Sequence, residues 1–167
     1  MTKWLLSAAL ILMAFPSGAI AQTKESLVGT WKLVCVTYTD GKGEVHQNVM
    51  GQNPTGFLTY TAEGRVSVII AYDGRKPFAD SSPSLEQTTE AFRTINAYAG
   101  SYTFTGDKVI HHIEVAWIQD LVNTDQVRSV KIEGDRLTLR GAFRVEGRPP
   151  DPGSPELVWE RLKPSKP

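Results

Sequence analysis

Apolar and polar positions alternate in short runs past residue 26, and glycine-bearing turns separate the runs. Alternation with a period of two is typical of β-strands that bury one face. Three pairs of runs flank short loops at residues 62–64, 105–107 and 133–135, each of which contains a glycine. Because glycine enters the positive-φ region at little steric cost, each pair predicts a β-hairpin.

The hairpins, together with a first strand in residues 30–39 and a last one in 156–162, give about eight predicted strands. Strands joined in sequence by hairpins predict an all-β fold built on an antiparallel sheet. A sheet of this size either closes into a barrel or packs as a sandwich, because both arrangements protect exposed edges.

Residues 71–98 break the alternation and begin as a loop. Ser84 and Gln87 fit a capping box, in which each side chain bonds the other residue's backbone N–H. An apolar stripe at helical spacing follows at Leu85, Phe92, Ile95 and Ala99. We therefore expect one short helix near residues 84–97, lying either across an open end of the barrel as a lid or against its outer wall.

The first 21 residues have the pattern of a secretory signal peptide. Lys3 precedes an apolar run over residues 4–15, and Ala19-Ile20-Ala21 is a small-residue cleavage site. This predicts export to the periplasm or the medium, with residues 22–167 as a single domain; an uncleaved anchor is the alternative. No later segment is apolar enough to span a membrane, so no stable insertion is expected after cleavage.

Charge and cysteine content narrow the range of partners. The chain has 18 basic and 18 acidic residues, and loss of Lys3 leaves 17 − 18 = −1. Without a basic cluster, a nucleic-acid partner is not expected. Cys35 is the only cysteine, so no internal disulfide can form.

The ordered segments at residues 56–68, 97–117, 124–140 and 157–162 resemble the bacterial lipocalin-like domain family. Gly29-Thr30-Trp31 resembles the G-x-W opening of lipocalins. The resemblance implies an up-and-down barrel with a cavity, of the calycin type. It also implies that Arg161 covers the ring of Trp31 at the closed end. Relatives in the wider group mostly bind small apolar molecules, and some isomerise or cyclise them.

The stretch at residues 109–117 carries two of the three histidines of the chain. In a regular strand, His111 shares a face with Val109, Ile113, Val115 and Trp117. The sequence leaves open which face points inward, and the apolar pattern favours this one. His112 and Glu114 lie on the other face, so the two histidines cannot hold one metal together. We expect no metal site and no cofactor.

The next predicted strand places Gln126 and Arg128 on one face. If the two strands pair, Arg128 could meet His112 and Glu114, because a buried carboxylate requires a cation or several donors. The candidate ligand-binding residues are His111, His112, Glu114, Gln126 and Arg128.

The sequence is compatible with three functions. A mostly apolar cavity with a few polar anchors favours binding of a small apolar or amphiphilic molecule. A histidine acting with Glu114 as acid and base would instead make a cofactor-free isomerase or cyclase. A structural or interaction module would have a filled barrel, packed by Phe57, Val68, Ile70, Val115, Leu137 and their neighbours. Binding is favoured over catalysis because no nucleophile, metal or cofactor motif stands out; the ligand and the oligomeric state are not predicted.

Overall fold

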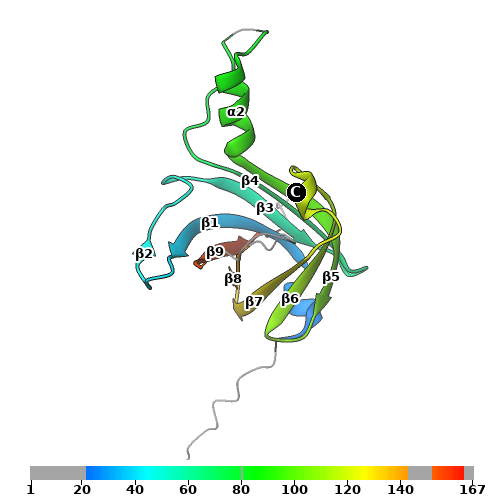
Figure 1. Cartoon of the computed structure of the whole chain (residues 1–167). Helices are drawn as coiled ribbons and strands as arrows, with labels where there is room; N and C mark the ends of the chain where they lie inside the picture. The colour runs from blue at the N-terminus through cyan, green and yellow to red at the C-terminus, as the bar shows by residue number, and fades with distance from the viewer. Residues whose placement is uncertain (1–21, 80, 143–151, 164–167) are drawn as a thin grey trace, which may run out of the picture.

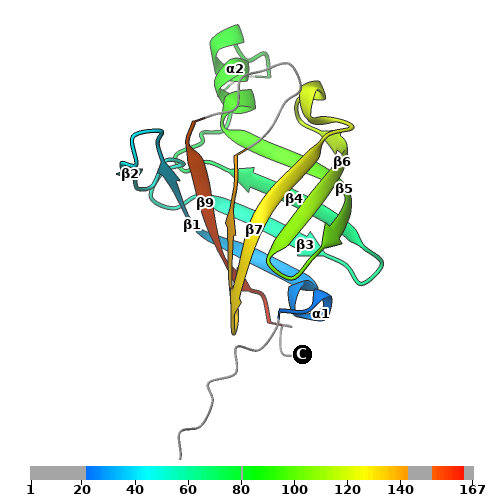
Figure 2. The ribbon, with the colours of Figure 1, turned by 60° about the horizontal axis from the view of Figure 1, so that its bottom comes forward.

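The computed structural model describes residues 22–79, 81–142 and 152–163. Within them, a nine-stranded antiparallel sheet curls until β1 (Gly29–Thr39) pairs with β9 (Ser154–Arg161) (Figures 1 and 2). This pairing closes an eight-stranded up-and-down barrel, and the short β2 (Val45–His46) adds to the edge of β1 outside the ring. The predicted all-β barrel is confirmed.

The three predicted hairpins are present. They are β3 (Thr55–Tyr60) with β4 (Arg65–Ala71), β5 (Ile95–Phe104) with β6 (Lys108–Ala116), and β7 (Asp125–Glu133) with β8 (Arg136–Arg140). Gly64, Gly106 and Gly134 in their turns have φ values of 88°, 97° and 60°. The hairpin turns therefore use the conformation that glycine adopts most readily.

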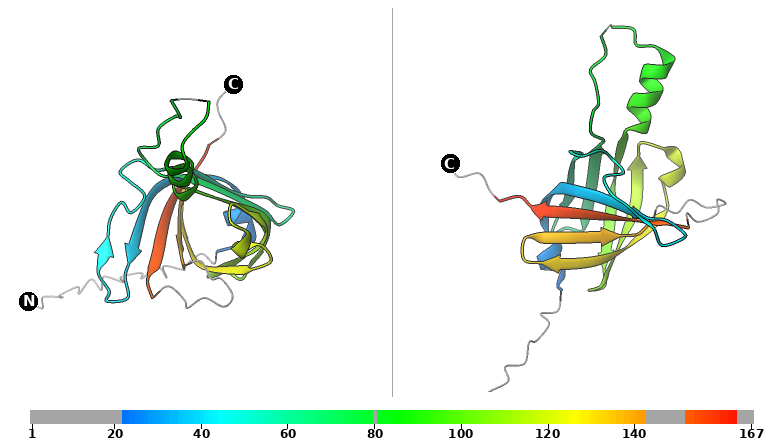
Figure 3. Two further views of the ribbon diagram at one scale, coloured as in Figure 1. Left: turned by 45° about the horizontal axis from the view of Figure 1, so that its top comes forward. Right: turned by 90° about the vertical axis from the view of Figure 1, so that its left-hand side faces the viewer.

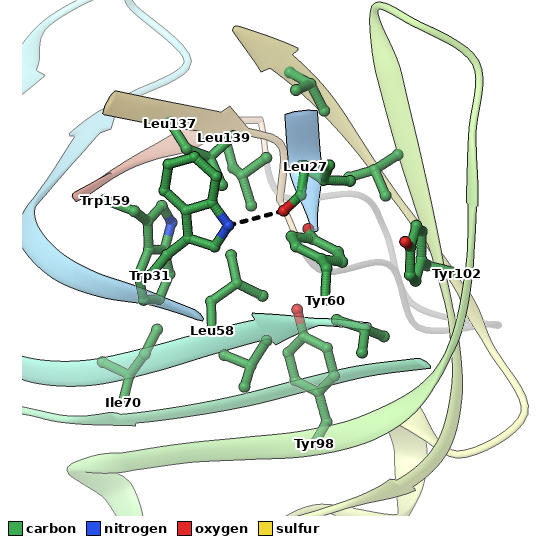
Figure 4. Close-up of a cluster of buried hydrophobic side chains, with 14 of the residues drawn as sticks. Leu27, Trp31, Leu58, Tyr60, Ile70, Tyr98, Tyr102, Leu137, Leu139 and Trp159 are labelled. Atoms are coloured by element: carbon green, nitrogen blue, oxygen red, sulfur yellow. Dashed lines mark hydrogen bonds between the residues drawn. The ribbon is translucent and has the colours of Figure 1, made fainter. Parts of the chain in front are cut away.

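Besides β2, two short elements were not predicted. Helix α1 (Lys24–Leu27) lies below the barrel, and a 3-10 turn, η1 (Gln119–Leu121), links β6 to β7 (Figure 2). The indole Nε1 of Trp31 donates to the carbonyl of Leu27 at 2.9 Å (Figure 4), which fixes α1 against the floor of the barrel. We call this the closed end of the barrel, and we call the opposite end, which carries η1, the open end.

A β-bulge changes the predicted faces of β6. Ala99 pairs with Val115 but Gly100 pairs with Ile113, so Glu114 is an extra residue on β6. The alternation shifts by one position there, and Val115 is exposed although the regular pattern places it inside. The prediction for Phe57 is also wrong, since its side chain is exposed on the outer face of β3, whereas Val68, Ile70 and Leu137 are buried as expected.

Helix α2 (Leu85–Arg93) forms with the predicted capping box between Ser84 and Gln87. It ends earlier than predicted because Ile95 begins β5 and pairs with Ala71. The helix stands away from the barrel at the open end (Figure 3), and none of its residues is buried. It is therefore neither a lid nor a helix packed on the outer wall of its own barrel.

Residues 1–21, the predicted signal peptide, lie outside the described residues. Among the helices that are described, none is both long and apolar enough to cross a membrane.

Candidate functional site

The interior of the barrel contains a buried polar group centred on His111 of β6, whose side chain is 0% exposed. The ring Nε2 lies 2.7 Å from the hydroxyl of Tyr60 on β3, and Nδ1 lies 2.8 Å from the hydroxyl of Tyr98 on β5. A neutral imidazole has one donor and one acceptor nitrogen, so two hydroxyls satisfy it. Figure 4 shows the Tyr98 hydroxyl pointing towards Tyr60.

Burial determines the ionisation of this group. Loss of solvation lowers the pKa of His111 to about 3, and the positive charges of Arg128 and His112 act in the same direction. Burial raises the pKa of Tyr98 to about 12 and that of Tyr60 well above its ordinary value. All three side chains are therefore neutral hydrogen-bonding groups at physiological pH.

Gln126 and Arg128 continue the polar group onto the neighbouring strand β7. Gln126 lies directly opposite His111, is 0% exposed, and its Nε2 donates to Thr124 Oγ1 at 2.7 Å. Arg128 is 5% exposed and its Nη1 donates to the carbonyls of Val127 and Ala142 at 2.9 and 3.0 Å. Burial lowers the pKa of the guanidinium, while the nearby Tyr98 and Tyr60 act in the opposite direction.

Apolar side chains form the other side of the interior. Buried residues there are Leu33 and Val36 of β1, Leu58 of β3, Leu139 of β8 and Trp159 of β9. The buried polar side chains therefore gather on β5 to β7 together with Tyr60 of β3, whereas the buried residues of β1, β8 and β9 are apolar. Such a division matches a ligand with one polar group and an apolar body.

Trp159 adds a buried donor to the apolar wall. Its side chain is 1% exposed and lies near Trp31 and Leu58 (Figure 4). Among the described residues, its indole Nε1 has no hydrogen-bond partner. A buried donor without an acceptor costs about 1–3 kcal/mol, so an acceptor brought by a ligand or a water molecule would be stabilising at this place.

His112 and Glu114 lie on the outside of the barrel, where neither can contact a molecule in the interior. His112 Nδ1 is 2.7 Å from Asp125 Oδ1, and its Nε2 is 2.9 Å from Thr103 Oγ1. Glu114 accepts two hydrogen bonds of 2.7 Å from Arg65, which lower the pKa of its carboxyl.

The expected meeting of His112, Glu114 and Arg128 is therefore wrong. The sheet itself separates the half-buried His112 and the exposed Glu114, on its outer face, from the buried Arg128 on its inner face. An acid–base pair of His111 and Glu114 loses its geometric basis for the same reason.

The closed end has the contact that the resemblance implied. The guanidinium carbon of Arg161 lies 4.0 Å from the ring centroid of Trp31, and the same side chain donates to the carbonyls of Ser26 and Val28 at 2.5 and 2.7 Å. Gly29 of the G-x-W motif has φ of 134°, and a Cβ at this position would lie 2.8 Å from Arg161 Nη1. Glycine therefore makes room for the arginine.

One group of described side chains has donor types suited to a metal ion. Ligand atoms of Asp40 and Glu44, in the turn between β1 and β2, and of His46 on β2 lie within 4.8 Å of one another. Asp40 Oδ1 also accepts 2.9 Å bonds from the backbone N–H groups of Lys42 and Glu44. These bonds form the turn, so turn structure alone explains why the side chains are close together.

A cleft of about 540 Å³ lies outside the barrel, between residues 73–79 and helix α2. Glu86, Gln87, Glu90, Ala91 and Thr94 line its helical side. Arg75 crosses it and donates to the carbonyl of Ala91 at 2.7 Å and to Thr94 Oγ1 at 2.6 Å. No pattern in the sequence predicts this cleft, because it depends on the direction in which α2 leaves the barrel.

The family model for the lipocalin-like domain matches residues 28–162. The chain belongs to this family. Among solved structures, a lipocalin-like protein from Bacteroides uniformis ATCC 8492 is 14% identical; the match covers 82% of this chain and 99% of that one, with a TM-score of 0.42. No curated protein matches the sequence. The lipocalin-like barrel is a fold that supports small-molecule binding.

Sequence reasoning missed the partnership of Tyr60 and Tyr98 with His111. The alternation of side chains along a strand predicts part of this arrangement. Tyr60 lies two residues after Leu58 and therefore shares its inward face. The register of β3, β4 and β5 is also needed to bring both hydroxyls to one ring, and no local pattern encodes that register.

Proposed function

We propose that the protein binds a small amphiphilic molecule in the half of the barrel nearest its open end. The ligand's polar group, an acceptor or an acid, faces Arg128 and Gln126 on β7. Its apolar body lies against the opposite wall, towards Val36 and Leu157. The barrel floor, packed by Trp31, Leu58 and Trp159, limits the depth of the site.

The observation that carries this proposal is the burial of three polar side chains on the inner faces of β6 and β7. A purely structural barrel gains more from apolar residues at such positions, since buried polar groups must be desolvated and then satisfied. Arg128 extends towards Ala142, at the open-end terminus of β8, so its charge lies on the side from which a ligand would enter. The partly buried Met50, Trp117, Ile118 and Leu157 supply further apolar surface.

Catalysis is a weaker candidate for this interior. With its pKa at about 3, His111 does not exchange a proton near neutral pH, and both of its nitrogens are occupied by tyrosine hydroxyls. General acid–base catalysis requires a group whose pKa lies near the pH at which the enzyme operates. Binding without turnover is consequently the function that these side chains suit best.

Native mass spectrometry of the purified protein, followed by organic extraction, tests the proposal. We expect a co-purified amphiphile at near-unit stoichiometry, or saturable uptake of anilinonaphthalene sulfonate, an anionic amphiphilic dye. A clean apo mass together with no dye uptake would overturn the proposal and indicate a filled barrel.

Variants locate the binding site. Arg128→Met keeps side-chain length and removes the charge, so it should weaken dye binding by about tenfold or more. Leu157→Trp adds bulk to the opposite wall and should block uptake even if Arg128→Met fails to fold. Glu114→Gln is the matched control, because Glu114 lies on the outer face and its loss should leave uptake unchanged.

We also infer that the protein acts outside the cytoplasm. Lys3, the apolar run over residues 4–15 and the Ala19-Ile20-Ala21 site support this proposal. Cell fractionation with N-terminal sequencing tests it: a mature chain that begins at Gln22 in the periplasm or medium is expected, and an intact cytoplasmic chain would contradict it.

A further inference from the structure

A hydroxyl, an imidazole and a carboxylate are hydrogen-bonded in a row on the outer face of the barrel. They belong to Thr103 of β5, His112 of β6 and Asp125 of β7, which lie on three neighbouring strands. Thr103 Oγ1 lies 2.9 Å from His112 Nε2, and His112 Nδ1 lies 2.7 Å from Asp125 Oδ1. The hydroxyl and the carboxylate therefore occupy the two nitrogens of one ring.

These contacts fix which nitrogen of the imidazole carries the proton. An ionised carboxylate only accepts hydrogen bonds, so the Nδ1–H group of His112 donates to Asp125. In the neutral ring, Nε2 then keeps its lone pair and accepts from the hydroxyl of Thr103. A base that takes the proton of a hydroxyl, and that is itself oriented by a third group, is the arrangement used for nucleophilic acyl transfer.

The register of the strands brings the three groups together. His112 pairs directly with Ser101 on β5 and with Asp125 on β7, and Thr103 lies two residues further along β5 than Ser101. The side chain of Ser101 hydrogen-bonds to the carboxyl of Glu114 and so serves another partner. Thr103 is therefore the residue that supplies a hydroxyl to the imidazole.

The next outward positions add an apolar contact and a positive charge. Thr103 pairs with Ile110, and Ile110 pairs with Val127, whose side chain is 40% exposed. This short apolar row lies beside the imidazole and suits the acyl part of a small substrate. Lys108 is exposed on the same face and diagonal to Thr103, which is within reach of a long side chain. Its ammonium group is suited to stabilise an oxyanion that forms next to Thr103.

We propose that Thr103, His112 and Asp125 hydrolyse small carboxylic esters on the outer face of the barrel, independently of any ligand in the interior. Thr103 Oγ1 bonds to the acyl carbon while its proton passes to His112 Nε2. The bond from the acyl carbon to the leaving alcohol breaks, and the alcohol takes the proton from His112. Water then attacks the acylated threonine and gives a proton to His112, which returns it to Thr103 Oγ1 as the acid leaves. Asp125 orients the ring and stabilises the imidazolium in both steps.

The exposure of the site determines how fast this reaction can be. The side chain of His112 is 37% exposed and that of Asp125 is 65% exposed, so water is not excluded. Water weakens the electrostatic stabilisation of the transition state. Turnover is therefore expected to be slow, and fastest for an ester with a good leaving group.

Hydrolysis of p-nitrophenyl acetate by the purified protein tests the proposal. We expect the rate to fall about tenfold or more in His112→Gln and in Thr103→Val, which keeps the shape of threonine without its hydroxyl. His46→Gln is the matched control, because His46 is also an exposed imidazole next to a carboxylate, with its Nε2 3.3 Å from Asp40 Oδ2. This variant should leave the rate unchanged.

Intact mass spectrometry during the reaction identifies the nucleophile. An adduct of one acetyl group, located on Thr103 by peptide mapping and absent from Thr103→Val, supports the covalent step. If the acylated threonine is too short-lived to be detected, the rate of Thr103→Val decides whether the hydroxyl takes part.

Three results would overturn the proposal. A full rate in Thr103→Val would exclude the hydroxyl as the nucleophile. A full rate in His112→Gln would exclude the imidazole as the base. Equal losses in His112→Gln and His46→Gln would mean that any exposed imidazole explains the hydrolysis.

Discussion

His111 has a different ionisation equilibrium in the folded and the unfolded chain. Its pKa is about 3 when folded, because the ring is buried, and near 6.5 when exposed. Between these values the unfolded chain binds one more proton than the folded chain. Stability from His111 is therefore complete above about pH 6.5 and decreases as the pH falls towards 3, by up to about 1.4 kcal/mol per pH unit.

Urea unfolding between pH 7 and pH 5 should show this loss, in a window where carboxylates remain ionised. His111→Gln removes the titrating group and should flatten the pH dependence, whereas His112→Gln on the outer face should retain it. The ring signals of His111 in the wild-type protein should not titrate above pH 5 by NMR. Equal slopes for wild type and His111→Gln would contradict the assignment.

At the scale of elements, the bulge in β6 decides which side chains face the interior. A Cβ added to Gly100 would lie 1.9 Å from the carbonyl oxygen of His112, so the bulge and the glycine require each other. The strand sequence shows two regular faces, and the bulge appears only when β6 is aligned with β5. This is why Val115 could not be placed correctly from its own pattern.

Gly100→Ala should consequently lower the free energy of unfolding by more than about 2 kcal/mol, through overpacking against backbone. Gly106→Ala, in the turn of the same hairpin, meets no atom within 4 Å and should cost about 1–2 kcal/mol through its positive φ alone. Chemical denaturation of both variants makes the comparison; a milder effect at Gly100 than at Gly106 would show that the bulge can relax.

On the scale of the whole molecule, the first and last strands must meet for the barrel to close. Arg161 contributes to this closure because it stacks on Trp31 and bonds two carbonyls next to α1. The contact joins the two ends of the described domain, because almost the whole barrel lies between Trp31 and Arg161 in the sequence.

Arg161→Met should lower the free energy of unfolding by about 2–4 kcal/mol, from the lost charged hydrogen bonds and cation–π contact. Arg140→Met removes an arginine whose partner, Glu156, lies on the barrel surface, and should cost about 0–1 kcal/mol. Guanidinium chloride unfolding measures both. Similar losses in the two variants would mean that the Trp31 contact does not stabilise closure.

The sequence by itself determined the features that depend on near neighbours. Alternation and turn glycines predicted the hairpins, the Ser84–Gln87 capping box located the start of α2, and strand parity separated His111 from His112. Parity also put Gln126 and Arg128 together on one face. These features follow from local backbone geometry, which each segment encodes within a few residues.

Only the tertiary structure decided which distant groups meet. Strand register brought Tyr60 and Tyr98 to the two nitrogens of His111, and the pairing of β6 with β7 placed Arg128 on the opposite side of the sheet from Glu114. The direction of α2 depends on how far β4 and β5 pair, and its length depends on where β5 begins. Each of these outcomes depends on contacts between segments far apart in the chain, so no single segment contains the information that fixes them.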